Sequence, residues 1–305
     1  MAVTAAMVKE LRERSGAGLS ACKEALVEAN GDLERASEIL REKGLAAAAK
    51  KAGRVAAEGL VYVTISDDRK AGAIVEVNSE TDFVAKNQDF ISYVHQLGDL
   101  ALSSKADNME AFMGEKMPNG ETVQESITQK VAIIGENIGL RRFERYIAGE
   151  NGVVIHYIHG GGRVAVMLEL DSTVVNDELI EAGRNLCMQI AAMSPQFVAR
   201  TDMPEEFIAK EKDIFIQQAI NEGRPANIAE KVVEGRLKKH LTTLCLLEQE
   251  YVKDGEMTCE KYVGSVGKSI GADVSVKRFV RYETGEGIEK KEENFAEEVS
   301  KAIGG

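Results

Sequence analysis

The hydrophobic positions of residues 4–43 recur every three or four residues, which is the spacing of helices with one buried face. The stretch "SGAGLS" and the turn Asn30-Gly31-Asp32 interrupt this pattern, so we predict three short helices. Residues 44–58, "GLAAAAKKAGRVAAE", have no apolar stripe and are predicted to form a semi-helical linker. A helical bundle this small is marginal alone, and it is more often a docking module than a catalyst.

Beyond residue 58 the pattern changes to that of strands. "LVYVTIS" and "AGAIVEVN" flank the turn "DDRK" and predict a β-hairpin, and "GVVIHYIH" and "RVAVMLELD" flank "GGG" and predict a second one. A helical pattern follows each hairpin. Residues 134–150, "IGENIGLRRFERYIAGE", also match residues 270–286, "IGADVSVKRFVRYETGE". We infer a duplicated unit of hairpin, helix, helix and strand, which predicts an α+β fold with two small antiparallel sheets covered by helices.

The second copy carries a large insert. Residues 204–223 and 226–250 are predicted to be two long helices joined by "EGRP", with Gly ending the first and Pro beginning the second. Such an arm would bury little apolar surface against its own core. One interpretation is therefore an antiparallel helical hairpin that binds a partner. The alternative is an extra helical layer packed on the sheet.

The first copy is instead longer at the junction between its hairpin and its first long helix. Val77 corresponds to Leu170 on the strands, and Phe90 corresponds to Leu179 where each apolar helical stripe begins. Between the strand position and the helix position, the first copy has four more residues than the second. The stretch "TDFV", residues 81–84, lies within this longer junction.

Phe83, in that stretch, has two interpretations. It precedes Phe90 by seven residues, so a continuous helix would direct both rings to the same core. However, polar Asn87 interrupts the stripe, and the second copy manages without this turn. Asp82 suits a helix N-terminus, where a negative charge is stabilised. The residues alone leave open whether Phe83 is a core aromatic or a protruding tip.

Composition narrows the class of protein. The chain has 305 residues, of which 44% are hydrophobic and 29% charged, with four Pro, as is typical of a helix-rich globular protein of about two domains. No apolar run reaches the roughly 20 residues that span a bilayer. Residues 1–14 lack the continuous apolar core of a signal peptide. We therefore predict a cytoplasmic protein without a membrane partner.

The charge balance argues against direct nucleic-acid binding. The net charge of −12 and the pI near 5.1 are opposite to what phosphate binding requires. Two local basic clusters are interpreted as solvated helix faces, although contact with an anion stays open. They are Lys50-Lys51-Arg54 and Arg236-Lys238-Lys239.

The chain offers little covalent chemistry. The four cysteines are far apart and form no C-x-x-C pair, as expected of reduced thiols. His156 and His159 are three apart on a predicted strand, so they point to opposite faces and make a joint metal site unfavourable. "GSVGKS" at 264–269 imitates the end of a Walker A motif, but Tyr262 occupies the position of the required Gly. We predict no cofactor, no metal and no enzymatic step.

Several blocks, in order along nearly the whole chain, resemble the elongation factor Ts family. They are "LRERSGAGLSACKEAL", "EVNSETDFVAKN", "IGENI", "HGGGRVAV", "NIAEKVVEGRLKK" and "FVRYETGEGIEK". The resemblance implies an ordered set of modules. These are a three-helix docking module resembling a ubiquitin-associated domain at 1–44, a linker at 45–58, a first half-core with the exchange tip at 59–150, a second half-core at 151–195 and 251–287, a helical dimerisation arm at 196–250 and a C-terminal helical module at 288–305.

The resemblance also implies roles for particular residues. Thr81, Asp82, Phe83 and Val84 match the segment that, in this family, dislodges magnesium from the nucleotide site of elongation factor Tu. The implied contacts with Tu are Arg12, Leu19 and Lys23 from the N-terminal module, Ile134 and Gly135 from the first half-core, and His159 from the second.

The implied function is guanine-nucleotide exchange on elongation factor Tu during translation elongation. The factor would bind Tu with GDP, disturb the magnesium and phosphate site, and promote GDP release so that GTP can bind. A homodimer or heterotetramer formed through the arm is implied as possible. The alternative function is a scaffold that binds partners through the ubiquitin-associated-like module without accelerating nucleotide release.

Overall fold

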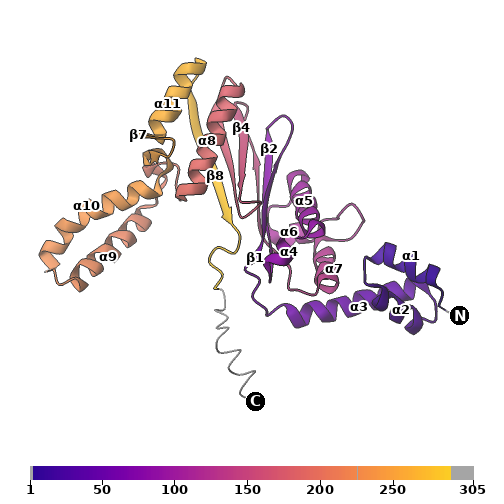
Figure 1. The fold of residues 1–305 in the computed structure, drawn as a ribbon. Coiled ribbons are helices and arrows are strands. Elements are labelled where there is room, and N and C mark those ends of the chain that lie inside the picture. The colour runs from indigo at the N-terminus through magenta and orange to yellow at the C-terminus, as the bar shows by residue number, and fades with distance from the viewer. Residues whose placement is uncertain (1–2, 225, 290–305) are drawn as a thin grey trace. The chain divides into compact units, whose positions relative to one another are not determined.

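The computed structural model describes residues 3–224 and 226–289. It combines helices with small antiparallel sheets, which confirms the predicted α+β class (Figure 1). The described chain divides into two compact units. Residues 3–62, 75–143 and 283–289 form the first unit, and residues 63–74 and 144–282 form the second.

Three helices begin the chain, as predicted. They are α1 (Ala5–Ser15), α2 (Leu19–Glu28) and α3 (Leu33–Lys51). Thr4 caps α1, and Asp32 caps α3 by accepting the N–H groups of Glu34 and Arg35. The fully buried Leu11, Cys22 and Leu26 lie in their common core.

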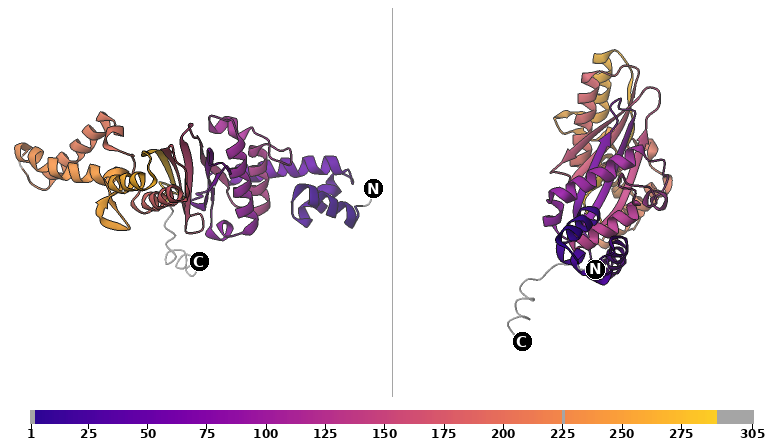
Figure 2. Two further views of the ribbon diagram at one scale, coloured as in Figure 1. Left: turned by 90° about the horizontal axis from the view of Figure 1, so that it is seen from above. Right: turned by 90° about the vertical axis from the view of Figure 1, so that its right-hand side faces the viewer.

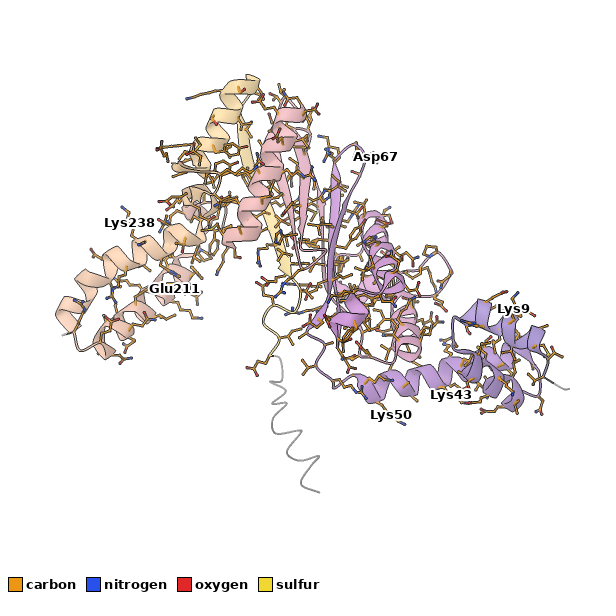
Figure 3. All side chains as sticks on the ribbon, viewed as in Figure 1. Lys9, Lys43, Lys50, Asp67, Glu211 and Lys238 are labelled. Atoms are coloured by element: carbon orange, nitrogen blue, oxygen red, sulfur yellow. The ribbon has the colours of Figure 1, made fainter. Side chains whose placement is uncertain are left out.

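The third helix is longer than the sequence pattern predicted. We expected it to end near residue 43, but α3 continues to Lys51 through the alanine run, whose residues have the highest helix propensity. Gly44 does not end it, because Gly44 is buried where α3 packs along α7 (Val123–Ile134). A Cβ at Gly44 would already touch Ala132, at 3.5 Å. Lys43 and Lys50 lie along the exposed side of α3 (Figure 3).

The first sheet contains β1 (Glu58–Ile65), β2 (Ala71–Ser79) and β3 (Gly139–Ile147), in that order. Between β2 and β3 the chain forms α4 (Asp82–Ala85), α5 (Gln88–Ser103), α6 (Met109–Met113) and α7. The apolar stripe of α5 faces inward and begins at the fully buried Phe90. The helix α7 ends at Gly135, whose left-handed φ of 85° lets the chain turn into β3.

The second sheet repeats this topology. It contains β4 (Gly152–His159), β5 (Val164–Ser172) and β8 (Val274–Glu283), in that order. The strands β4 and β5 pair antiparallel, from Gly152 opposite Asp171 to His159 opposite Val164. Helix α8 (Asp177–Met193) covers this sheet, and α11 (Cys259–Ile270) packs against α8 and leads through Gly271 into β8 (Figure 1). Both predicted hairpins and the repeated ending of helix, Gly and strand are confirmed.

The insert in the second copy forms α9 (Glu205–Asn221) and α10 (Ala226–Leu244), which lie side by side (Figures 1 and 2). The arm has an apolar cluster of its own, which includes Met203, Ala219 and Leu241. Its surface carries charged side chains such as Lys238 (Figure 3). Short elements η1 (Arg200–Asp202), η2 (Leu246–Glu248), β6 (Glu250–Tyr251) and β7 (Asp254–Thr258) connect the arm to its half-core.

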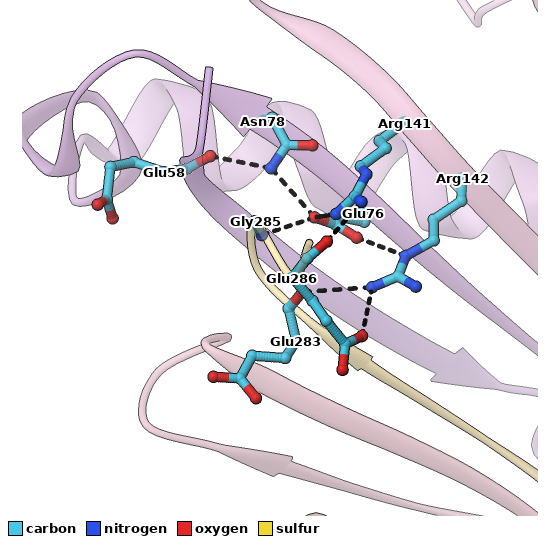
Figure 4. A network of polar contacts seen from close by, with 8 residues as sticks. All are labelled: Glu58, Glu76, Asn78, Arg141, Arg142, Glu283, Gly285 and Glu286. Atoms are coloured by element: carbon cyan, nitrogen blue, oxygen red, sulfur yellow. Dashed lines mark hydrogen bonds and ion pairs between the residues drawn. The ribbon is translucent and has the colours of Figure 1, made fainter. Parts of the chain in front are cut away.

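A buried carboxylate anchors the last described segment to the first sheet (Figure 4). Glu76 of β2 has no exposed surface, and its oxygens contact Arg141 at 3.1 Å and Arg142 at 2.5 Å. The N–H of Gly285 donates to the same carboxylate at 2.8 Å. Only a glycine fits here, because φ is 70° and a Cβ would lie 2.1 Å from a backbone oxygen. Pairing with two guanidinium groups is what makes burial of this charge tolerable.

The four cysteines are buried and free. Burial raises the pKa of the Cys259 thiol to about 12 and that of Cys245 to about 11, so neither is a ready nucleophile. No helix within the described parts of the chain is long and apolar enough to cross a membrane. The predicted C-terminal module at 288–305 lies outside the described residues, apart from its first two positions.

Candidate functional site

The predicted tip is a one-turn helix between β2 and α5. Thr81 is its N-cap, with an extended backbone and a hydroxyl that accepts the N–H of Val84 at 3.4 Å. Asp82 begins the helix and accepts a hydrogen bond from Lys86, four residues later, at 2.5 Å. That hydrogen bond lowers the pKa of Asp82 below its usual value, because it stabilises the charged form of the carboxyl group.

Phe83 protrudes from this turn. Its relative exposure is 82%, whereas Phe90, one element further on, is fully buried. The core interpretation of Phe83 is therefore wrong. Asn87 explains why, because its extended backbone (ψ 131°) ends the first turn and its side chain caps α5 anew. A seven-residue spacing places two side chains on one face only when the helix between them is continuous.

The tip lies against the loop that follows α7. Ile134 is the last residue of α7, and Gly135 is its exposed left-handed cap. The next residue, Glu136, accepts the backbone N–H of Thr81 at 3.0 Å. The structure therefore brings together the two segments of the first half-core that were predicted as functional, residues 81–84 and 134–135. Sequence reasoning had not identified Glu136 as the residue that joins them.

The predicted N-terminal contacts lie on the three-helix module. Arg12 of α1 and Lys23 of α2 are exposed, and Leu19, the first residue of α2, is 54% exposed. Leu19 and Lys23 are four residues apart and share one helix face. No described hydrogen bond joins them to Phe83 or to Glu136.

A groove of about 1030 Å³ is lined mainly by residues of α2, α3 and α7. Its lining includes Ser20, Arg41 and Ile133, but none of the four tip residues. The tip instead presents an exposed aromatic ring outside this groove. It suits insertion into another molecule better than it suits enclosing a small substrate.

His159 lies in the second unit, at the exposed end of β4. Its Nδ1 is 3.0 Å from the hydroxyl oxygen of Tyr157. The turn that follows contains three glycines with positive φ, at 160–162. This contact holds the imidazole ring at the surface, next to a tight turn.

The structure also locates the other candidate motifs of the sequence. "GSVGKS" lies within α11, ahead of β8, which reverses the strand-to-helix order of a P-loop. Across residues 3–224 and 226–289, no three His, Cys, Asp or Glu side chains are grouped as a metal ion would require. Arg54, from one basic cluster, lies 3.4 Å from the carboxylate of Glu80.

Comparisons with known proteins agree on one family. The family model described as "Elongation factor TS" matches residues 80–286. Curated proteins named Elongation factor Ts from Clostridium perfringens (strain SM101 / Type A) and Clostridium botulinum (strain Eklund 17B / Type B) are each 52% identical over 302 residues. The relative from Clostridioides difficile (strain 630) is 50% identical over 301 residues. In all three cases the match covers 99% of this chain and 99% of the relative.

Proposed function

The chain belongs to the elongation factor Ts family and is a translation elongation factor, and from this premise we propose that it is the guanine-nucleotide exchange factor of elongation factor Tu. The observation that supports this proposal most is the 82% exposed Phe83 on a capped turn. A large aromatic side chain that is kept in water by its own fold is available to a partner.

The nucleotide site of the partner sets the energetic requirement. A P-loop protein holds GDP through backbone amides, a Lys and Mg²⁺, and nanomolar binding corresponds to about 12 kcal/mol. An exchange factor binds better to the nucleotide-free form, and by linkage it weakens nucleotide binding by the same factor. The Mg²⁺ ion in this scheme belongs to Tu, and the exchange factor requires no cofactor of its own.

Phe83 supplies only part of this requirement. Burying one Phe side chain yields about 1.5–3 kcal/mol, or one to two decades of affinity. The remainder has to come from a wider interface that holds the tip in place. We assign this role to the exposed Arg12, Leu19 and Lys23, to Ile134 and Gly135 beside the tip, and to His159.

No covalent step is part of this function, so the protein is not an enzyme in the usual sense. Phe83 and Val84 offer only apolar surface, and Asp82 is held by Lys86. Their proposed contribution is to compete with Mg²⁺ and phosphate for space and for hydrogen bonds.

The arm is proposed as a further interface, which would pair either with a second copy or with Tu. Ile214 and Ile220 of α9 are 42% and 37% exposed although the arm has its own core. Light scattering of the protein alone and mixed with Tu, for wild type and Ile214→Glu, tests this role. Loss of the larger species in the variant supports it, and unchanged masses contradict it.

The exchange function is tested with purified Tu loaded with fluorescent GDP. Wild-type protein is expected to accelerate GDP release in a concentration-dependent, saturable way. Binding to Tu without faster release would instead favour the scaffold function. Accelerated release therefore separates the two functions directly.

A further inference from the structure

The carboxylate of Glu136 accepts three hydrogen bonds from Glu80 and Thr81, at the start of the tip. One oxygen accepts the backbone N–H of Glu80 at 3.1 Å and that of Thr81 at 3.0 Å. The other oxygen accepts the hydroxyl of Thr81 at 2.6 Å. One side chain thus fixes both the backbone and the side chain of the residue that caps α4.

Glu80 in turn holds the loop that contains Glu136 and Asn137. Glu80 accepts the backbone N–H of Asn137 at 2.6 Å, and the guanidinium of Arg54 lies 3.4 Å from the Glu80 carboxylate. The side-chain amide of Asn137 donates to the carbonyl of Arg54 at 2.8 Å. Two carboxylates therefore hold the 80–81 and 136–137 loops together. Glu136 accepts two backbone N–H groups of the first loop, and Glu80 accepts one of the second.

The hydroxyl of Thr81 passes this constraint on to the tip. A Thr hydroxyl has one proton, which here is donated to Glu136, so a lone pair is left to accept the N–H of Val84. Phe83 lies between Thr81 and Val84 in the chain, and its side chain is largely exposed. The direction of the ring then depends on the cap, and the cap depends on Glu136.

The second copy of the duplicated unit lacks both the tip and the carboxylate. In the aligned blocks Ala272 takes the place of Glu136, while Gly271 keeps the left-handed cap of Gly135. A helix can therefore end and turn into its strand without this Glu. The carboxylate occurs only in the copy that has a tip to hold.

We propose that Glu136 is a positioning residue for the exchange tip, one that holds Thr81 so that Phe83 is presented to the partner in a fixed direction. This inference rests on the proposed exchange function. It adds to that function a residue that does not itself need to touch Tu.

The first test compares GDP release from Tu for Glu136→Ala, Phe83→Ala and the double variant. Because a misdirected ring loses most of the burial that Phe83 contributes, Glu136→Ala should lower the maximal release rate by about tenfold. Since Glu136 acts through Phe83, it should have little further effect once Phe83 is already Ala. Multiplicative effects in the double variant, or an unchanged rate in Glu136→Ala, would overturn the inference.

The matched control is Thr122→Ala at the other end of α7. Thr122 caps this helix by accepting the N–H of Glu125, and it makes no described contact with the tip. Its loss weakens the same helix but leaves the pair of Glu125 with Arg41 in α3 available. A comparable fall in release rate would show that Glu136→Ala acts only through helix stability, which would overturn the inference.

A second measurement needs no partner. Amide hydrogen exchange at Glu80, Thr81 and Val84 of the free protein should become at least about tenfold faster in Glu136→Ala, because each loses a direct or relayed hydrogen bond. Glu136→Asp, which keeps the charge on a shorter side chain, should lie between wild type and Ala. Unchanged exchange would overturn the role of Glu136 alone, whereas wild-type protein that fails to accelerate GDP release would overturn the proposed function itself.

Discussion

The two half-cores pass from sheet to helix in different ways. In the second, Asn176 caps α8 four positions after β5 ends at Ser172. In the first, Asn87 caps α5 eight positions after β2 ends at Ser79, and α4 occupies the extra length. Both junctions use the same kind of cap, and each helix buries its first apolar residue, so the shorter one is sufficient for the fold. The longer one adds a feature that folding does not require.

The loops that follow α7 and α11 differ as well. Gly135 and Gly271 end their helices alike, but Glu136 follows the first and Ala272 the second. The added turn and the added carboxylate therefore occur together. In one half-core this region builds a protrusion, and in the other it only connects two elements.

The largest expected effect concerns stability and separates Phe90 from Phe83. Phe90→Ala removes a fully buried ring and should lower the free energy of local opening of α5 by about 3–5 kcal/mol. Phe83→Ala changes an exposed position and should alter it by no more than about 0.5 kcal/mol. Amide hydrogen exchange within α5 measures both. Equal effects would mean that Phe83 belongs to the core after all.

The next effect concerns function, and it is measured by shortening the first junction to the length of the second. Deleting residues 82–85 makes the first junction as short as the second, so the circular dichroism spectrum should be preserved. GDP release from Tu should slow by about 10- to 100-fold, which corresponds to the 1.5–3 kcal/mol of one buried Phe. A folded deletion variant with the wild-type release rate would show that the added turn has no function.

A smaller effect is expected at the cap of the tip. Thr81→Ala removes the hydroxyl that bonds Val84 and Glu136 and should cost about 0.5–2 kcal/mol of local stability. Thr81→Ser keeps the hydroxyl and is the control. The exchange rate of the Val84 amide is the readout, and the cap has no importance if Ser and Ala give the same rate.

The smallest effect concerns pH. Because Lys86 lowers the pKa of Asp82 in the folded protein, the resulting stabilisation is present above about pH 4 and is lost as the pH falls through the lowered value. Lys86→Ala should raise the titration midpoint of the Asp82 carboxyl toward the usual value for Asp. Carboxyl-carbon NMR follows this titration directly. An unchanged midpoint would exclude Lys86 as the cause.

Much of the fold could be predicted from the sequence because it follows from local patterns. The alternating strands and the repeated blocks around Gly135 and Gly271 each indicated their own structure. The end of α3 could not be predicted in this way. The alanine run favours a helix, but Gly44 before it is a usual helix end. The contact that buries Gly44 is with α7, far away in the sequence, and the local pattern could not show it.

The site was predicted only in part, for a related reason. Phe83 was ambiguous because its spacing from Phe90 fits one continuous helix, and the break depends on the backbone of Asn87. No local sequence pattern marks Glu136 as part of the site, because it contacts Thr81 only once the sheet has brought the two loops together. Its replacement by Ala272 in the duplicated block was the available sign.

The central claim is that an exposed ring at this junction opens the nucleotide site of Tu, and stopped-flow release of fluorescent GDP tests it most directly. With Phe83→Ala at saturating concentration, complex formation with Tu should remain detectable while GDP release slows by about tenfold or more, since the variant loses the burial of one aromatic side chain. Release at the wild-type rate would contradict the account.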